Sequence, residues 1–161
     1  MSISVRNAET GDFAPIAMLA RDQLGYDCED SLVKSRLEHL DNTREAVFVA
    51  ENDGTVIGFI HVQVYEVLYY ETMLNILGLA VSDKHRRMGV GSMLVKSAER
   101  LASEMGIGCI RLNSGGKRTG AHEFYRSQGF DNEKIQLRFL KKIDFQKKHL
   151  TKRKSCAKLI P

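Results

Sequence analysis

The sequence predicts a single α/β (α+β) domain in which helices flank one mixed central sheet. Short runs rich in Val, Ile and Phe alternate along the chain with stretches whose apolar residues recur every three or four positions. These are the patterns of strands and of amphipathic helices. The chain has 161 residues, of which 43% are hydrophobic and 27% are charged. This length and composition suit one core in one domain of ordinary size.

The N-terminal half is predicted to hold a strand, two helices and a hairpin. The strand covers Ile3 to Ala8, and Thr10 is a suitable N-cap for a helix from about Asp12 to Leu24. A second helix over Glu29 to Leu40 follows from apolar residues at helical spacing. The hairpin joins two β-rich runs, 46–50 and 55–64, which flank an Asp-Gly pair.

The C-terminal half alternates strands and helices. A buried strand is predicted over Met73–Val81 and a long amphipathic helix over Gly89–Met105. A strand over Ile107–Leu112 and a helix over Thr119–Gln128 come next. Alternation of apolar residues predicts a last strand over Lys134–Ile143.

The positive charge of the chain is concentrated in its last residues. Positions 144–161 carry six Lys and Arg residues against the single acid Asp144, whereas the whole chain has a net charge of +4. Residues 1–143 are therefore predicted to form the folded domain, and 144–161 a basic tail. Because the net positive charge of the chain comes from the tail, that charge does not identify the domain as a nucleic-acid binder. Nucleic acid would be contacted only through the tail.

The cysteines and the hydropathy pattern bear on the setting of the protein. Cys28, Cys109 and Cys156 form no CxxC pair, and the histidines lack metal-ligand spacing, so no metal site is predicted. No apolar run approaches the roughly 18 residues of a membrane span. The first residues also lack a signal-peptide pattern. We expect a reduced, cytoplasmic setting with no membrane contact.

A glycine-containing loop before the long helix has the features of a phosphate site. Asp83 to Arg87 form a polar, basic loop after the buried strand, and Gly89 and Gly91 open the helix. The first turn of a helix has free N–H groups and a positive dipole end, which suit a pyrophosphate. Neither a P-loop nor a dinucleotide fingerprint fits, because Gly91 is followed by Ser92-Met93 and the third glycine is replaced by Leu94.

The segment Arg86-Arg87-Met88-Gly89-Val90-Gly91 resembles the coenzyme A signature of the GCN5-related N-acetyltransferase (GNAT) superfamily. Downstream, residues 121–130, Ala-His-Glu-Phe-Tyr-Arg-Ser-Gln-Gly-Phe, resemble the second signature of that superfamily. The resemblance implies a mostly antiparallel sheet with a splayed central strand, and acetyl-CoA as the cosubstrate. It covers about Val5 to Ile143 and is specific from Ile76 to Phe130.

The resemblance also implies which residues would hold acetyl-CoA. Free backbone groups on the splayed strand would pair with pantetheine, and the amide of Leu79 would polarise the thioester carbonyl. Arg118 stands where many relatives carry Asn, which makes it a candidate contact to a nucleotide phosphate. The cofactor-binding set is Leu79, Ala80, Val81, Arg86, Arg87, Met88, Gly89, Val90, Gly91, Ser92, Asn113, Arg118, Ala121 and Tyr125.

Tyr125 matches the tyrosine of the superfamily that protonates the departing thiolate. A phenol is protonated at neutral pH and can direct a single donor at sulfur, although a core aromatic would fit the same helix. The general base stays open between Glu71 and Glu66, followed by His61, which would equally suit a core histidine. A direct transfer without an acyl-enzyme is expected, because no cysteine offers a convincing nucleophile.

The predicted activity is transfer of acetyl from acetyl-CoA to a primary amine, with a small molecule as the acceptor. The first two helices and the segment near Tyr65–Glu71 would form the acceptor site, where Asp27, Glu29 and Asp30 would suit a cationic amine. Two alternatives stay open: a protein N-acetyltransferase, and a CoA-binding domain whose tail tethers it to RNA or another acidic partner. A homodimer is also compatible with the sequence.

Overall fold

The computed structural model describes residues 2–131 and 134–143 and divides into two units, Met1–Phe130 and Asp131–Pro161. The basic tail predicted over 144–161 lies outside the described residues. Within the described part, every helix and strand belongs to the first unit. No helix of that part has both the length and the apolar character needed to cross a membrane.

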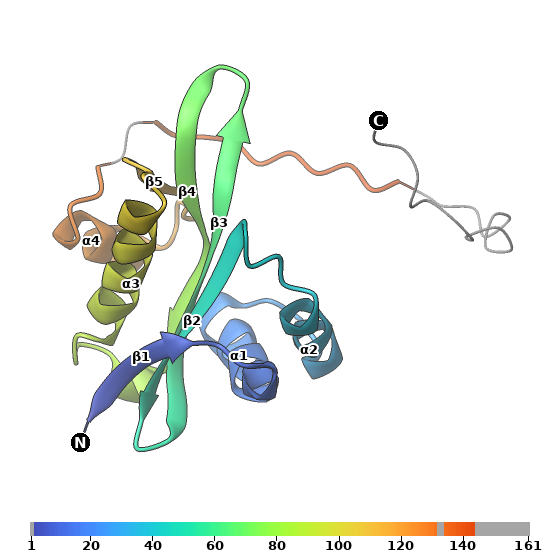
Figure 1. The fold of residues 1–161 in the computed structure, drawn as a ribbon, viewed down its shortest axis with the longest axis vertical. Helices are drawn as coiled ribbons and strands as arrows, with labels where there is room; N and C mark the ends of the chain where they lie inside the picture. Colours follow the sequence, from blue (N-terminus) through green and yellow to red (C-terminus); the bar gives the residue numbers. More distant parts are fainter. Residues whose placement is uncertain (1, 132–133, 144–161) are drawn as a thin grey trace, which may run out of the picture. The chain divides into compact units, whose positions relative to one another are not determined.

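Five strands of the first unit form one sheet in the order β1-β2-β3-β4-β5 (Figure 1). Neighbouring strands are antiparallel except for β4 and β5, which are parallel. The mixed, mostly antiparallel sheet is therefore confirmed. The strands are β1 Ile3–Asn7, β2 Glu45–Asn52, β3 Thr55–Val67, β4 Tyr70–Val81 and β5 Ile110–Leu112.

The helices cover both faces of the sheet. Figure 1 shows α1 and α2 on one side of the strands, and α3 and α4 on the other. A 3-10 turn at Thr10–Asp12 precedes α1, and a π-helical turn at Ala20–Leu24 continues it, so the first predicted helix is present with a change of winding. The α-helices are α1 Phe13–Leu19, α2 Asp30–Glu38, α3 Val90–Glu104 and α4 Thr119–Ser127.

The first helical segment begins differently from the prediction, which placed Thr10 at the N-cap. Glu9 is the N-cap, and Thr10 lies inside the first turn. The carboxylate of Asp12 accepts a hydrogen bond from the Glu9 N–H at 2.7 Å and two from the Arg6 guanidinium at 2.8 and 3.0 Å. The Asp12 carboxylate thus bonds back to the amide of the N-cap residue, as in a capping box, and the turn begins after Glu9.

The last predicted strand is not formed. Residues 134–143 have no strand hydrogen bonding, and the alternating apolar residues Ile135, Leu137 and Phe139 are 95%, 79% and 87% exposed. An alternating pattern forms a strand only where a neighbouring strand pairs its backbone and a core covers one face. Neither condition is met in this segment, so the prediction was wrong.

Two apolar clusters hold the helices on the sheet. Val90, Leu94 and Ala98 of α3 pack on Ile60, Val62 and their neighbours, and Ile16 and Leu19 of α1 pack on Val49 and Phe59 of the opposite face. Gly58 of β3 allows α3 to approach the sheet closely. A Cβ at Gly58 would lie 3.0 Å from the carbonyl oxygen of Ala80 and 3.3 Å from the side chains of both Val90 and Leu94.

We expect Gly58→Val to lower the free energy of unfolding by about 1–3 kcal/mol, the usual cost of overpacking a core. Chemical denaturation would measure it. The control is Gly78→Ala in β4, where the added Cβ would meet its nearest atoms at 3.6 and 3.8 Å. That change should cost less than about 1 kcal/mol. Equal losses in the two variants would show that close approach at Gly58 is not the constraint.

Candidate functional site

β4 and β5 separate partway along their length and leave a gap between them. Their parallel pairing is limited to Leu74–Ile76 of β4 and Ile110–Leu112 of β5. β5 then ends, whereas β4 continues to Val81 while still paired with β3 on its other side. The edge of β4 from Leu77 to Val81 is therefore open toward the gap, as a splayed strand requires.

Hydrogen bonding to β3 determines which backbone groups of β4 point into this gap. The Ser82 N–H donates to the Ile57 carbonyl at 2.8 Å, so backbone groups at Ser82 face β3. Antiparallel pairs alternate between facing the partner and facing away, which directs the groups of Leu79 and Val81 away from β3. The groups of Ala80 face Phe59 of β3, so the expectation that Ala80 offers free backbone groups was wrong.

A β-bulge marks the point at which the gap opens. His61 of β3 pairs with Gly78 and Val62 pairs with Ile76, which leaves Leu77 as the extra residue on β4. Bulges bend a strand and increase its local twist. The bulge also explains the change of direction along β4: the Leu74 N–H still donates to Cys109 beside β5, at 2.9 Å, whereas Leu79 faces the gap.

The N-terminus of α3 presents backbone amides that have no partner within the helix. Gly89 is the N-cap with a φ of 79°, a left-handed conformation that favours glycine. The Met93 N–H donates to the Gly89 carbonyl at 3.0 Å, and the amides of Val90, Gly91 and Ser92 precede this first helical bond. Three amides and the positive end of a 15-residue helix therefore remain for an anion.

Gly91 has a second role that the sequence did not indicate. A Cβ at Gly91 would lie 3.0 and 3.1 Å from two ring atoms of Phe124 in α4. The two segments that resemble superfamily signatures are thus in contact through this glycine. A side chain at position 91 would therefore displace the Phe124 ring.

The arginines around the loop differ in their partners. Arg86 pairs with Asp83 at 2.8 Å and donates to the Gln23 side chain at 2.7 Å, and Arg118 donates to the Gln23 carbonyl at 3.4 Å. Arg87, with a φ of 62°, makes no hydrogen bond or ion pair within the described residues. Of these three predicted contacts, Arg87 alone has a guanidinium that makes no hydrogen bond or ion pair with any described group.

Tyr125 lies in an aromatic cluster on α4. Its ring makes edge contacts with Phe124 and Phe130, at centroid separations of 5.3 and 5.7 Å. Burial raises the pKa of the Tyr125 phenol above its ordinary value of 10.0, and the charge of Arg118 opposes this rise. The phenol is therefore held in its protonated form at neutral pH. Ala121 precedes Tyr125 by one turn, and Asn113 follows β5, where it accepts from Arg111 at 3.3 Å.

The two carboxylates predicted as bases lie away from the gap. Glu66 forms an ion pair with Arg44 at 2.9 Å. Glu71 is exposed near the β3–β4 turn and precedes Leu79 by eight residues on one strand, a separation of roughly 25 Å at the usual rise per residue. His61, the third candidate, lies opposite Gly78 at the bulge, and its Nε2 is 3.0 Å from the Glu45 carboxylate.

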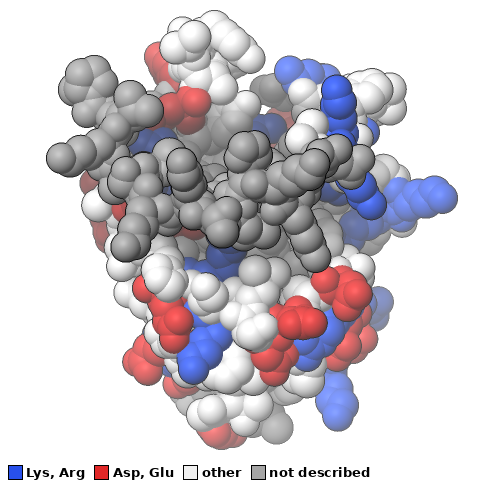
Figure 2. Space-filling view, turned by 90° about the vertical axis from the view of Figure 1, so that its right-hand side faces the viewer, with Lys and Arg blue, Asp and Glu red and all other residues white. Residues whose placement is uncertain are grey.

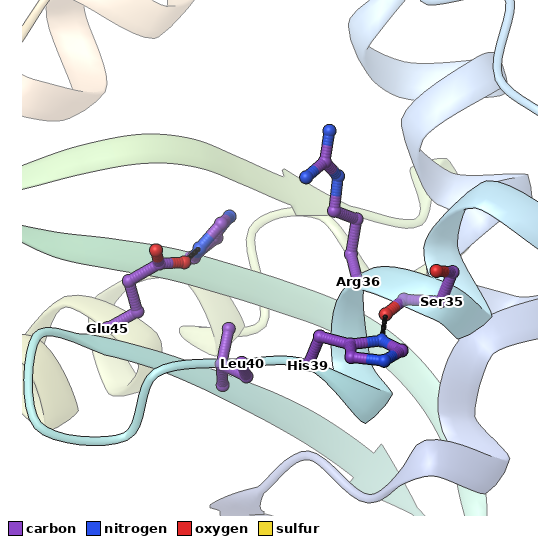
Figure 3. Close-up of a pocket in the computed structure, with 6 residues that line it drawn as sticks. Ser35, Arg36, His39, Leu40 and Glu45 are labelled. Atoms are coloured by element: carbon purple, nitrogen blue, oxygen red, sulfur yellow. Dashed lines mark hydrogen bonds and ion pairs between the residues drawn. The ribbon is translucent and has the colours of Figure 1, made fainter. Parts of the chain in front are cut away.

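A pocket that the sequence did not predict lies between the end of α2 and strands β2 and β3. Its volume is about 380 Å³. In Figure 3, Glu45 stands on one side of it and Arg36 and His39 on the other, with Leu40 between. The six lining residues are Ser35, Arg36, His39, Leu40, Glu45 and His61. No pattern in the sequence linked α2 to β2, because that contact depends on tertiary packing.

The face of the molecule in Figure 2 carries charges of both signs. Below the grey residues, acidic and basic side chains lie next to one another and form no extended basic area. That part of the surface therefore lacks the single-sign footprint that is typical of nucleic-acid binding.

Comparisons with known proteins found a matching family model and a similar relative. The family model described as Acetyltransferase (GNAT) family matches residues 13–130. An uncharacterized N-acetyltransferase of Chlorobaculum tepidum is 33% identical over 114 residues, which are 69% of this chain and 69% of that protein.

Solved structures share the fold. A transcriptional regulator from Bacillus halodurans has a TM-score of 0.77 at 25% identity, over 86% of this chain and 99% of that one. The enzyme AAC(6')-Iy, solved in complex with the bisubstrate analogue CoA-S-monomethyl-acetylneamine, has a TM-score of 0.76 at 18% identity, over 89% of this chain and 100% of that one. At that identity the likeness concerns the fold alone.

The raised pKa of Tyr125 predicts a specific loss of stability in alkali. As the pH rises past about 10, the unfolded chain releases the phenol proton before the folded chain does. The unfolded state is thereby stabilised relative to the folded state. We expect Tyr125→Phe to lose less thermal stability than the wild type between about pH 9 and 11. Melting temperatures across this range would measure it. Tyr69→Phe, which alters an exposed residue, is the control and should follow the wild type.

Proposed function

We propose, from the premise that the chain belongs to the acetyltransferase (GNAT) family, that it transfers acetyl from acetyl-CoA directly to the primary amine of a small molecule. It is an acetyl-CoA-dependent N-acetyltransferase by membership of that family. The observation that carries the proposal is the open edge of β4, which ends beside the free amides of α3. The acceptor and the roles of individual residues are the proposed part.

The chain offers groups of the right kind for each part of acetyl-CoA. The α3 amides from Val90 to Ser92 suit the pyrophosphate, and Arg87 is available to add charge beside it. Leu79 and Val81 present backbone donors and acceptors to an amide-containing arm in the gap. Arg86 and Arg118 would contact phosphates only after leaving Gln23.

Two groups supply the proposed chemistry. The Leu79 amide, fixed by the strand and directed into the gap, would stabilise negative charge that develops on the thioester oxygen. Tyr125 would give its phenol proton to the departing thiolate, and burial keeps that proton in place at neutral pH. The acceptor amine would attack the thioester bound at the open edge of β4 directly. No covalent enzyme intermediate is formed, so only one transfer step is required.

A small molecule is favoured as acceptor because the described pocket on the α1 and α2 face is of small-molecule size. The reduced, cytoplasmic setting is part of this proposal.

The test is release of CoA thiol from acetyl-CoA in the presence of amino acids, aminophosphonates, polyamines, aminoglycosides and N-terminal peptides. Product mass must increase by one acetyl group on the amine. Transfer to peptides alone would replace the small-molecule acceptor with a protein.

The uncommitted guanidinium of Arg87 gives a test of the phosphate site. We expect Arg87→Glu to weaken acetyl-CoA binding by about 10- to 100-fold, the value of a charge-assisted hydrogen bond. Calorimetry would measure the affinity. Lys96→Glu makes the same change of charge at an exposed position later in α3 and should have little effect. A similar loss in both variants would indicate a general charge effect and remove the assignment.

The acid role of Tyr125 predicts a large catalytic effect from the loss of one hydroxyl group. Tyr125→Phe keeps the ring contacts with Phe124 and Phe130. We expect the single-turnover rate to fall by about 10²- to 10⁴-fold while acetyl-CoA affinity stays nearly unchanged. Single-turnover rates are needed because product release can limit kcat. A rate close to that of the wild type would leave Tyr125 as a core aromatic residue.

A further inference from the structure

The pocket beneath α2 lies on the face of the sheet that α1 and α2 cover. Phe59 of β3 packs in the α1 cluster, so His61, two residues later, projects on the α1 and α2 side. His61 is paired with Gly78, whose missing Cβ would point at Leu24 and Phe59 of that same side. No β4 side chain therefore stands between the imidazole and the open edge of β4 at this register position.

The hydrogen bond between His61 and Glu45 has a defined direction, from the imidazole to the carboxylate. The carboxylate of Glu45 can only accept, so the Nε2 of His61 carries the proton in their 3.0 Å contact. In the neutral ring, Nδ1 is then the nitrogen with a free lone pair. Gln63 donates a second hydrogen bond to the same carboxylate at 3.2 Å, which fixes its orientation. This is the arrangement of a base that is oriented by a carboxylate.

Arg36 supplies the opposite charge on the other side of the pocket. It is exposed on α2 and makes no hydrogen bond or ion pair with the part of the chain that the structure describes. Figure 3 shows its side chain extending from α2, with Glu45 on the strand side of the same pocket. A planar guanidinium binds carboxylates and phosphates through two parallel hydrogen bonds. The pocket therefore presents an anion site at one end and a carboxylate with a base at the other.

We propose that this pocket binds an amine that carries an anionic group, with the anion on Arg36 and the amine at the His61–Glu45 pair. The proposal rests on the proposed acetyl transfer and names its class of acceptor. A carboxylate and a phosphonate or phosphate share the chemistry that Arg36 recognises. Polycationic amines would place a positive charge against Arg36, so they are disfavoured here.

The step balances with the groups present. His61 Nδ1 removes a proton from the ammonium group, and the free amine attacks the thioester carbon. The new N–C bond forms as the C–S bond breaks, and the thiolate takes the proton of Tyr125. The attacking nitrogen gives up its remaining extra proton to solvent. His61 then releases the proton it took and the Tyr125 phenolate takes one up from solvent, which restores both groups.

The experiment compares each amine with a partner that lacks the anion: β-alanine with β-alaninamide, and 2-aminoethylphosphonate with ethanolamine. We expect kcat/KM to be about 10- to 100-fold higher for at least one anionic member than for its neutral partner. The two anionic probes separate a carboxylate acceptor from a phosphonate or phosphate acceptor. Spermidine and an aminoglycoside complete the panel.

Variants test which residues cause the difference in kcat/KM between anionic amines and their neutral partners. Arg36→Gln should raise KM for the preferred anionic amine by about tenfold or more and leave that of its neutral partner unchanged. Lys34→Gln removes the same charge from α2 outside the pocket and should change neither. His61→Gln retains a donor for Glu45 and should lower kcat by about 10²-fold or more with little change in KM.

The outcomes separate this inference from the function on which it rests. Preference for the neutral partners or for the polycations, or equal effects of Arg36→Gln and Lys34→Gln, would overturn the acceptor class while acetyl transfer stands. An unchanged kcat in His61→Gln would remove the base. Bound acetyl-CoA without transfer to any amine of the panel would contradict the proposed function itself. Calorimetry with acetyl-CoA and melting temperatures would establish that each variant is folded.

Discussion

Backbone hydrogen bonds hold β4 on only one side beyond Ile76, because β5 ends at Leu112 while β3 continues beside β4 to Gly58. A strand in this condition exposes a row of donors and acceptors that a soluble protein otherwise covers. Here the row is short and lies beside a helix N-terminus. The backbone itself therefore forms the predicted binding surface, and side chains add to it at a few positions. The bulge at Leu77 determines which amides that surface contains.

Much of the fold could be predicted because local patterns and packing agree. The strand–helix order from β1 to α4 follows from period and turn residues, and those elements fold with shifts of a few residues at their ends. The gap between β4 and β5 could be predicted only because two short segments resemble superfamily signatures. Nothing in the periodicity of 73–81 distinguishes a strand paired on both sides from one that is open on one side.

The failures have physical causes that a sequence pattern does not contain. The segment 134–143 has the alternation of a strand, but pairing and coverage must come from elsewhere, and alternation carries no information about them. Thr10 is a suitable cap by residue type, yet the Asp12 carboxylate, already held by Arg6, bonds to the Glu9 amide, and the turn begins one residue earlier. Glu71 is a suitable base by chemistry, but the length of β4 separates it from Leu79.

The contact between Gly91 and Phe124 links the proposed anion site to the proposed acid. The first turn of α3 and the aromatic cluster of α4 meet where glycine leaves room for a ring, and Tyr125 packs on that same ring at 5.3 Å. Closely packed groups transmit small displacements to one another rather than absorbing them. The position of the phenol therefore depends on the backbone that surrounds the phosphate site. A glycine in the first segment and an aromatic ring in the second therefore meet a single steric requirement in this chain, although 32 residues of sequence lie between Gly91 and Phe124.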